Sequence, residues 1–219
     1  FRFLIEKIIF HMKRTLLIRL CPFVLTVLLL LTGLTASKAQ SSSPFFQDNT
    51  YFDTDYFIME IEKKMLDLLK SSTNYLDTST ALIQLKDKKS AVVEIKKITP
   101  FDKIISSRDL AHQLRKSTVL FGVAFDVENN DQIHVNPATG YIIDEDGIVV
   151  TNHHVVESFT FAEGVTKLAM GIATDEGKVY LVTEVLSTNK DNDLCIVRVD
   201  TRGDKLTALP IGMPAQQGD

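Results

Sequence analysis

The sequence of 219 residues is poor in cysteine, with only two. One of them, Cys21, lies in an apolar N-terminal segment that we expect to be removed, which would leave Cys195 alone. A single cysteine cannot form an intramolecular disulfide, so the fold must be held by its hydrophobic core. Cys195 stands within an apolar run, where a buried small hydrophobe is expected rather than a reactive thiol.

A strong excess of charge of either sign is also missing. The net charge is −4, and acidic residues interleave with the lysines, so no sustained basic stripe forms. Nucleic acids and anionic membrane surfaces are bound by concentrated positive charge, so we predict no nucleic-acid partner. Hydrophobic residues make up 45% of the sequence and charged residues 24%, which is typical of an ordinary folded protein.

The longest apolar run is near the N-terminus, from Leu16 to Leu34, and it is preceded by Lys13 and Arg14. Positive residues before an apolar segment, with small residues after it, are typical of a secretory signal. We therefore predict that residues 1–39 are an upstream extension and a signal peptide, that Met12 is the true start, and that cleavage follows Ala39. The protein would then be extracytoplasmic, in the periplasm or secreted. The alternative is an uncleaved signal anchor, which would keep it at the membrane.

Residues 40–104 carry no visible chemistry and are predicted to be an N-terminal extension. Apolar residues spaced three and four apart predict an amphipathic helix over 56–70. Alternating apolar and polar residues over 80–98 predict a β-hairpin. A short helix is expected over 106–116, with Ser107 as its N-cap.

From Thr118 onward the pattern is that of an all-β protein. Short apolar or β-branched runs alternate with turn residues, and Gly147 is suited to a turn that requires a positive φ. This spacing predicts a small antiparallel barrel or sandwich. The expected strands are at 118–127, 139–143, 147–151, 165–173, 178–187 and 194–199.

Two polar groups at strand ends carry the candidate chemistry. The strand before Asn152 ends in a polar cluster that includes His153 and His154, where a rigid sheet can fix an imidazole that solvent still reaches. Asp193 directly precedes an apolar strand and needs a hydrogen-bond donor there, which a histidine Nδ1–H can supply. A histidine of this cluster is therefore the candidate general base, and Asp193 is the candidate carboxylate that orients it. Asp191 is interpreted as a solvated turn residue.

Residues 140–156 resemble the region around the catalytic histidine of HtrA/DegP-like serine proteases, whose pattern is G-x-I-I-x-x-D-G-x-I-V-T-N-x-H-V. His154 stands at the position of the base, and His153 stands at the variable position before it. Asp193 to Val199 is similar to the D-[IL]-A-[VL]-[IL]-x-[IV] strand of the family, with Cys195 in place of the usual alanine. Residues 209–219 resemble the stretch that leads out of the family's first barrel.

The resemblance implies a mostly β fold over 105–219, the first barrel of a chymotrypsin-like double β-barrel, preceded by a helix and hairpin extension. It implies a serine endopeptidase acting on polypeptides, without a metal or organic cofactor, and leaves a homo-oligomer open. No serine here has the G-N-S-G-G flanks of the family's nucleophile. We therefore expect the serine beyond residue 219, and expect this fragment alone to be inactive.

Two other interpretations stay open. His153, His154 and Glu157 could be zinc ligands, although no HisGluXaaXaaHis spacing or second cluster accompanies them. The chain could also be a non-catalytic protease homologue that acts as a binding or interaction module, because a fold does not by itself imply activity.

Overall fold

The computed structural model describes residues 45–47, 51–96, 98, 105–126, 132–161 and 165–212. All of them fall within one compact unit, residues 43–219. The predicted signal segment, residues 1–39, lies outside the described residues. Among the helices that the structure describes, none is long and apolar enough to cross a membrane.

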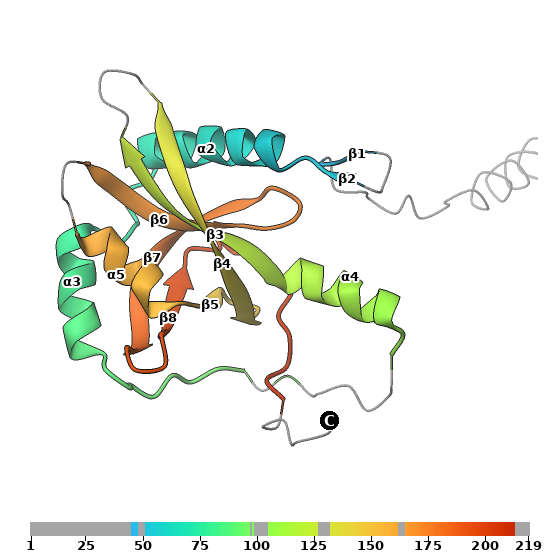
Figure 1. Ribbon diagram of the computed structural model, residues 1–219. Coiled ribbons are helices and arrows are strands. Elements are labelled where there is room, and N and C mark those ends of the chain that lie inside the picture. The colour runs from blue at the N-terminus through green and yellow to red at the C-terminus, as the bar shows by residue number, and fades with distance from the viewer. Residues whose placement is uncertain are drawn as a thin grey trace, which may run out of the picture. The chain divides into compact units, whose positions relative to one another are not determined.

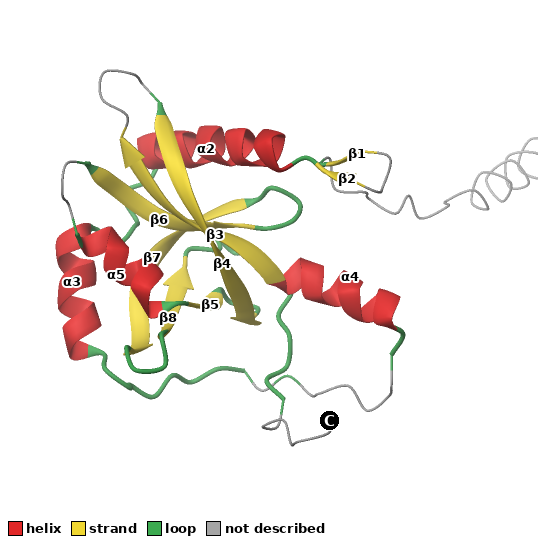
Figure 2. Ribbon diagram, viewed as in Figure 1, coloured by secondary structure: helices red, strands yellow, loops and turns green. Residues whose placement is uncertain are grey.

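Six antiparallel strands form a closed barrel in the order β3-β4-β5-β8-β7-β6, with β3 and β6 closing it (Figures 1 and 2). The predicted small barrel is therefore confirmed. The strands are β3 (Thr118–Asp126), β4 (Ile133–Asp144), β5 (Ile148–Thr151), β6 (Lys167–Ala173), β7 (Val179–Asn189) and β8 (Leu194–Val199). The main difference from the predicted ranges is β4, which begins at Ile133 because its N-terminal half pairs with β3 despite its polar residues.

The turn between β4 and β5 contains Gly147 at φ +91°, as its sequence predicts. Side chains directed into the barrel form a core that includes Phe121, Ile172 and Tyr180, all fully buried. Tyr180 still satisfies its hydroxyl, which donates to Asp204 at 2.7 Å.

A long helix, α2 (Thr54–Ser71), precedes the barrel, as predicted for 56–70. Its side chains Phe57, Ile61 and Met65 are buried in a second core, against apolar residues of the outer barrel surface. In Figure 1, α2 lies across the strands, and two short strands, β1 (Phe46–Gln47) and β2 (Tyr51–Phe52), pair before it.

The predicted hairpin over 80–98 is wrong: residues 78–87 form a helix, α3 (Thr78–Asp87). Asp77 caps the helix by accepting from the Thr80 amide, and Ala81 and Leu85, one turn apart, are buried in the barrel core cluster. The apolar pair Leu82 and Ile83 is instead exposed, which the alternating pattern concealed. The described residues between 91 and 98 form no strand.

Two smaller helices differ in detail from their predictions. The helix α4 (Ser107–Ser117) confirms the one expected over 106–116, but its N-cap is Ser106 rather than Ser107, since the Ser106 hydroxyl accepts from the Asp109 amide. The polar cluster after β5 opens a further helix, α5 (His153–Thr160), which the pattern of strands in the sequence did not indicate. His153 and His154 therefore lie on the first turn of a helix.

Candidate active site

The site is built where β5 ends beside the start of β8. Thr151, the last residue of β5, pairs with Cys195 of β8, which brings the start of α5 next to the turn that precedes β8. Asn152 is the N-cap residue of α5, yet its side chain does not cap the helix. Its Nδ2 donates instead to the Asp193 carbonyl oxygen and to Asp193 Oδ2, at 3.2 and 3.1 Å.

The structure brings the two predicted residues together. Nδ1 of His154 lies 2.7 Å from Asp193 Oδ2, and the backbone N–H of His154 donates to Asp193 Oδ1 at 2.9 Å. The His153 amide also donates to the Asp193 carbonyl, at 3.1 Å. Asp193 adopts a left-handed backbone conformation, φ +50°, which turns its carboxylate toward these donors.

The charge of Asp193 is stabilised by these donors. The His154 amide, followed by its imidazole, lowers the pKa of the Asp193 carboxyl below its ordinary value, with a smaller contribution from Asn152. An ionised carboxylate only accepts hydrogen bonds, so the neutral His154 ring must carry its proton on Nδ1. Its Nε2 is then left as an acceptor. With 68% of the His154 side chain exposed, an incoming group can reach that atom.

Each of the three candidate metal ligands has a hydrogen-bond partner outside the set. His153 Nδ1 lies 2.6 Å from the Thr188 hydroxyl, while His154 is bonded to Asp193. Glu157 accepts from Lys190 Nζ at 2.7 Å. Within the described residues, no group of three histidine, cysteine or acidic side chains is arranged to hold a metal ion.

The remaining candidates lie where their sequence suggested. Cys195 is fully buried, and burial raises the pKa of its thiol to about 12, which removes the thiolate at neutral pH. Asp191 is exposed in the turn before β8. Sequence reasoning missed Asn152 and the bond between His153 and Thr188. A polar cluster at a strand end was visible, but its partners lie about 35 to 40 residues away in the sequence.

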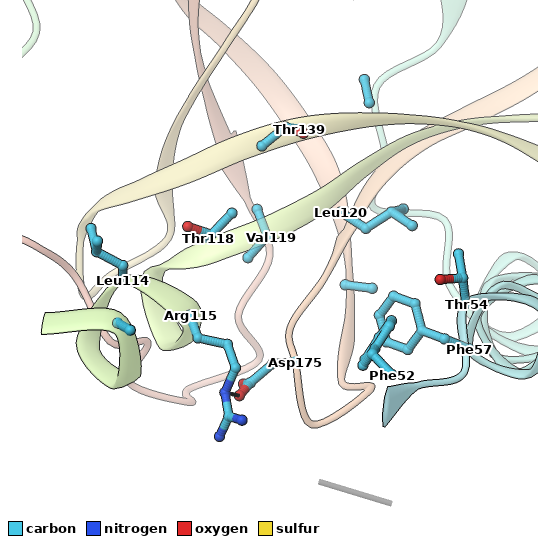
Figure 3. A pocket seen from close by; sticks show the side chains of 13 residues that line it. Phe52, Thr54, Phe57, Leu114, Arg115, Thr118, Val119, Leu120, Thr139 and Asp175 are labelled. Atoms are coloured by element: carbon cyan, nitrogen blue, oxygen red, sulfur yellow. Dashed lines mark ion pairs between the residues drawn. The ribbon is translucent and has the colours of Figure 1, made fainter. Parts of the chain in front are cut away.

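An apolar cavity of about 650 Å³ lies elsewhere, where β2 and α2 approach α4 and the start of β3 (Figure 3). Phe52, Phe57 and Leu120 line one part of it, and Arg115 forms an ion pair with Asp175 at 3.0 Å in another. None of the site residues described above lines it, so this cavity is not part of the candidate active site.

A closed antiparallel barrel with an aspartate bonded to an accessible histidine at one end is the arrangement of a trypsin-fold, protease-like protein. Residues 138–219 match the family described as a trypsin-like peptidase domain. A cyanobacterial protein from Synechocystis, named "Putative serine protease HhoA", is 30% identical over 101 residues. That match covers 45% of this chain and 23% of the relative, so the chain spans about a quarter of its length. The predicted resemblance and the mostly β fold with a small closed barrel are thus confirmed, whereas the predicted hairpin before the barrel is a helix.

Proposed function

We propose that this chain supplies the general base and the orienting carboxylate of an HtrA-type serine endopeptidase. The observation that carries the proposal is the His154–Asp193 pair, in which Nδ1 is bonded and Nε2 is open to solvent. The family match and the Synechocystis relative support protease-type chemistry on this barrel.

In the proposed reaction, His154 Nε2 takes the proton of a serine hydroxyl as that oxygen attacks the peptide carbonyl. Asp193 holds the ring in the required tautomer and stabilises the imidazolium, which then protonates the leaving amine. Water and the same base complete the hydrolysis of the acyl-enzyme. The substrates would be polypeptides.

The proposal requires a nucleophile from outside the 219 residues. Within the described part of the chain, no serine hydroxyl lies within hydrogen-bond distance of the His154 ring. In HtrA-type proteases such a serine stands in a G-N-S-G-G motif of a second barrel, together with the backbone donors that stabilise the oxyanion, and we propose the same arrangement for the complete protein. A sequence of this kind downstream of residue 219 is therefore expected in the complete gene.

Cleavage of unfolded casein by the product of the complete gene tests the proposal. We expect His154→Ala to abolish cleavage, and Asp193→Asn to lower it by a factor on the order of 10⁴, because the wrong tautomer is then favoured. His112→Ala, a change of an exposed histidine on α4, is the matched control and should leave cleavage unchanged.

Two further readouts separate the alternatives. Serine-directed fluorophosphonates should label the complete protein and block it, whereas a chelator should leave it active. Undiminished cleavage by His154→Ala would contradict the role given to His154. A wild-type protein that neither cleaves nor takes up the label would favour the non-catalytic binding module.

The location of the protein is proposed from its sequence alone. We propose export from the cytoplasm through residues 1–39, with a mature N-terminus at Gln40. N-terminal sequencing of the protein recovered outside the cytoplasm tests this. A product that remains in the membrane fraction and keeps the apolar segment would instead be anchored there.

A further inference from the structure

His153 differs from its neighbour His154 in almost every respect. Only 8% of the His153 side chain is exposed, compared with 68% for His154. Its Nδ1 lies 2.6 Å from the hydroxyl of Thr188, which is itself buried near the end of β7. The proposed function uses His154 and leaves this buried imidazole without a role.

Thr188 is also one of the residues through which the N-terminal extension is bonded to the barrel. Its amide donates to the Lys88 carbonyl at 3.0 Å, and its carbonyl accepts from the Ser90 amide at 2.8 Å. Lys89 thereby forms a parallel bridge with Thr188, directly after α3. Thr188 thus connects the end of α3 to the His153 ring.

The opposite edge of the His153 ring faces Glu157, one turn further along α5, and Glu157 is in turn bonded to the turn that carries Asp193. Nε2 is buried without a hydrogen-bond partner and lies 3.6 Å from Glu157 Oε1. The same Glu157 oxygen accepts from Lys190 Nζ, and the Lys190 carbonyl accepts from the Asp193 amide at 3.1 Å. The ring is therefore enclosed between α5, the end of β7 and the 190–193 turn.

We propose that His153 is a positioning residue: its bond to Thr188 fixes the first turn of α5 against β7 and so holds His154 on Asp193. The segment Lys88–Ser90 acts through Thr188 on the same bond, which gives the N-terminal extension a part in ordering the site. The predicted effect of His153 on the geometry of the His154–Asp193 pair does not depend on any activity. The consequence of that effect for catalysis rests on the proposed function.

The chemistry of the contact indicates a directed hydrogen bond. The Thr188 hydroxyl lies 2.6 Å from Nδ1 of His153 and 3.5 Å from the Leu194 carbonyl, so its hydrogen bond is with the imidazole. The Glu157 carboxylate beside Nε2 only accepts, so the neutral His153 ring carries its proton on Nε2 and its Nδ1 accepts from the Thr188 hydroxyl. If the imidazole is removed, a buried hydroxyl loses its partner, which destabilises this arrangement of the loop. A residue that only filled space would have no such requirement.

Variants that separate volume from hydrogen bonding test the proposal in the 219-residue chain. His153→Phe keeps a ring but has no nitrogen that forms a hydrogen bond, Thr188→Val removes the hydroxyl at similar size, and His153→Asn keeps an amide near the Nδ1 position that can form a hydrogen bond with the hydroxyl. Carbon-13 NMR follows the titration of the Asp193 carboxyl, and nitrogen-15 NMR reports the proportion of His154 that carries its proton on Nδ1. His134→Phe, on β4, is the control.

We expect His153→Phe and Thr188→Val to raise the pKa of Asp193 by about 0.5 or more, a roughly threefold loss of preference for the ionised form. Both should also reduce the Nδ1–H form of His154, whereas His153→Asn and His134→Phe should behave like the wild type. If His153 acts only by filling space, His153→Phe will leave the Asp193 pKa and the Nδ1–H form of His154 unchanged, and His153→Asn will alter both. That result would overturn the proposal.

The extension is tested through Ser90, whose φ is +49°. Ser90→Pro removes the amide that donates to Thr188 and cannot adopt this φ, whereas Ser90→Gly keeps both. We expect the proline variant alone to reproduce the effect of Thr188→Val on Asp193. Wild-type signals in the folded proline variant would disprove the contribution of the extension.

Asp193→Asn serves as the reference for a His154 without its carboxylate. If the wild-type His154 already resembles that reference, the pair does not form and the proposed function fails with it. If the wild type shows the pair and His153→Phe leaves it intact, only the positioning role is wrong.

Discussion

Single residues with unusual backbone conformations determine where the polar atoms of this barrel lie. Asp193 adopts φ +50° directly before β8, a conformation that aspartate tolerates better than most residues. Gly147 and Gly203 also have positive φ, at +91° and +89°. The two glycines differ in their surroundings, so substitutions at them separate the cost of backbone strain from the cost of steric overlap.

We predict that Gly203→Ala lowers the free energy of unfolding by about 1 to 2 kcal/mol, because only the backbone is strained. No atom lies within 4 Å of the position where its Cβ would be placed. Gly147→Ala should lower the free energy of unfolding by about 1 to 3 kcal/mol more than Gly203→Ala does. The reason is that its Cβ would be 2.6 Å from Thr201 Cγ2 and 2.9 Å from the Val199 carbonyl oxygen. Urea unfolding followed by circular dichroism measures both.

Gly212→Ala provides the control, because it has open space and no positive φ. Its free energy of unfolding should be within about 0.5 kcal/mol of the wild-type value. Equal losses for Gly147→Ala and Gly203→Ala would show that the contact with Thr201 and Val199 relaxes without cost.

Cys195 yields a second prediction for a single residue. Burial raises the pKa of its thiol to about 12, so very little thiolate is present at pH 8. In a Cys21→Ser background, an aromatic disulfide reagent should leave the native protein unlabelled and should react with one thiol after unfolding in urea. Rapid labelling of the native protein would show that the start of β8 opens locally.

The sequence could predict His154 and Asp193 because each lies in its own local motif next to an apolar strand. It could not predict the bonds of Asn152 to Asp193 or of His153 to Thr188. These contacts depend on which residues of β5, β7 and β8 stand opposite one another, and register is set by the folded sheet. Local pattern thus identified the His154–Asp193 pair, while the residues that support the pair could be found only in the three-dimensional structure.

At the scale of elements, the helix α3 shows why periodicity failed. Ala81 and Leu85, which lie one helical turn apart, pack in the core. Leu82 and Ile83 add apolar character on the exposed side and imitate a strand. The better signal was Asp77, because an aspartate followed by hydroxyl residues is typical of a helix N-terminus.

We predict that Asp77→Ala lowers the free energy of unfolding by about 1 kcal/mol at neutral pH, because the helix loses its cap. The Asp77 carboxylate accepts from the Ser79 hydroxyl and from the amide and hydroxyl of Thr80, which lower its pKa well below the ordinary range. A lowered folded-state pKa stabilises the fold above the unfolded value, near pH 4, and this contribution disappears as the pH falls through the folded value.

The difference between wild type and Asp77→Ala should therefore shrink below about pH 4. Asp77→Asn is the matched control, because asparagine caps a helix nearly as well and does not titrate in this range. Thermal unfolding at a series of pH values measures all three proteins. A constant difference down to pH 2 would mean that the charge of Asp77 has no part in the cap.

For the molecule as a whole, the helices that the structure describes before the barrel are part of the same folded unit as the barrel. The helix α2 places Phe57, Ile61 and Met65 in one buried cluster with residues of β3, β4, β6 and β7. The helix α3 contributes to the other cluster, inside the barrel. Folding of the extension and of the barrel should therefore be one cooperative process, since each buries apolar surface of the other.

Two methionines on the same helix test this coupling. Met65 is 1% exposed and its Cε lies against Gly171 of β6, whereas Met59 is 55% exposed. We predict that Met65→Ala lowers the free energy of unfolding by about 2 to 5 kcal/mol, through lost burial and the cavity left behind. Met59→Ala, the same change on the outer face of α2, should stay within about 0.5 kcal/mol of the wild type.

The decisive measurement is whether two probes report one transition. Far-UV circular dichroism follows the helices. Tyrosine absorbance, measured in a Tyr51→Phe, Tyr56→Phe background, follows mainly Tyr180, which is buried in the barrel, because Tyr75 and Tyr141 are exposed. If α2 and the barrel unfold together, Met65→Ala will move both transitions to lower urea by the same amount. If only the dichroism transition moves, α2 is a separately stable attachment, and the barrel does not need the extension to fold.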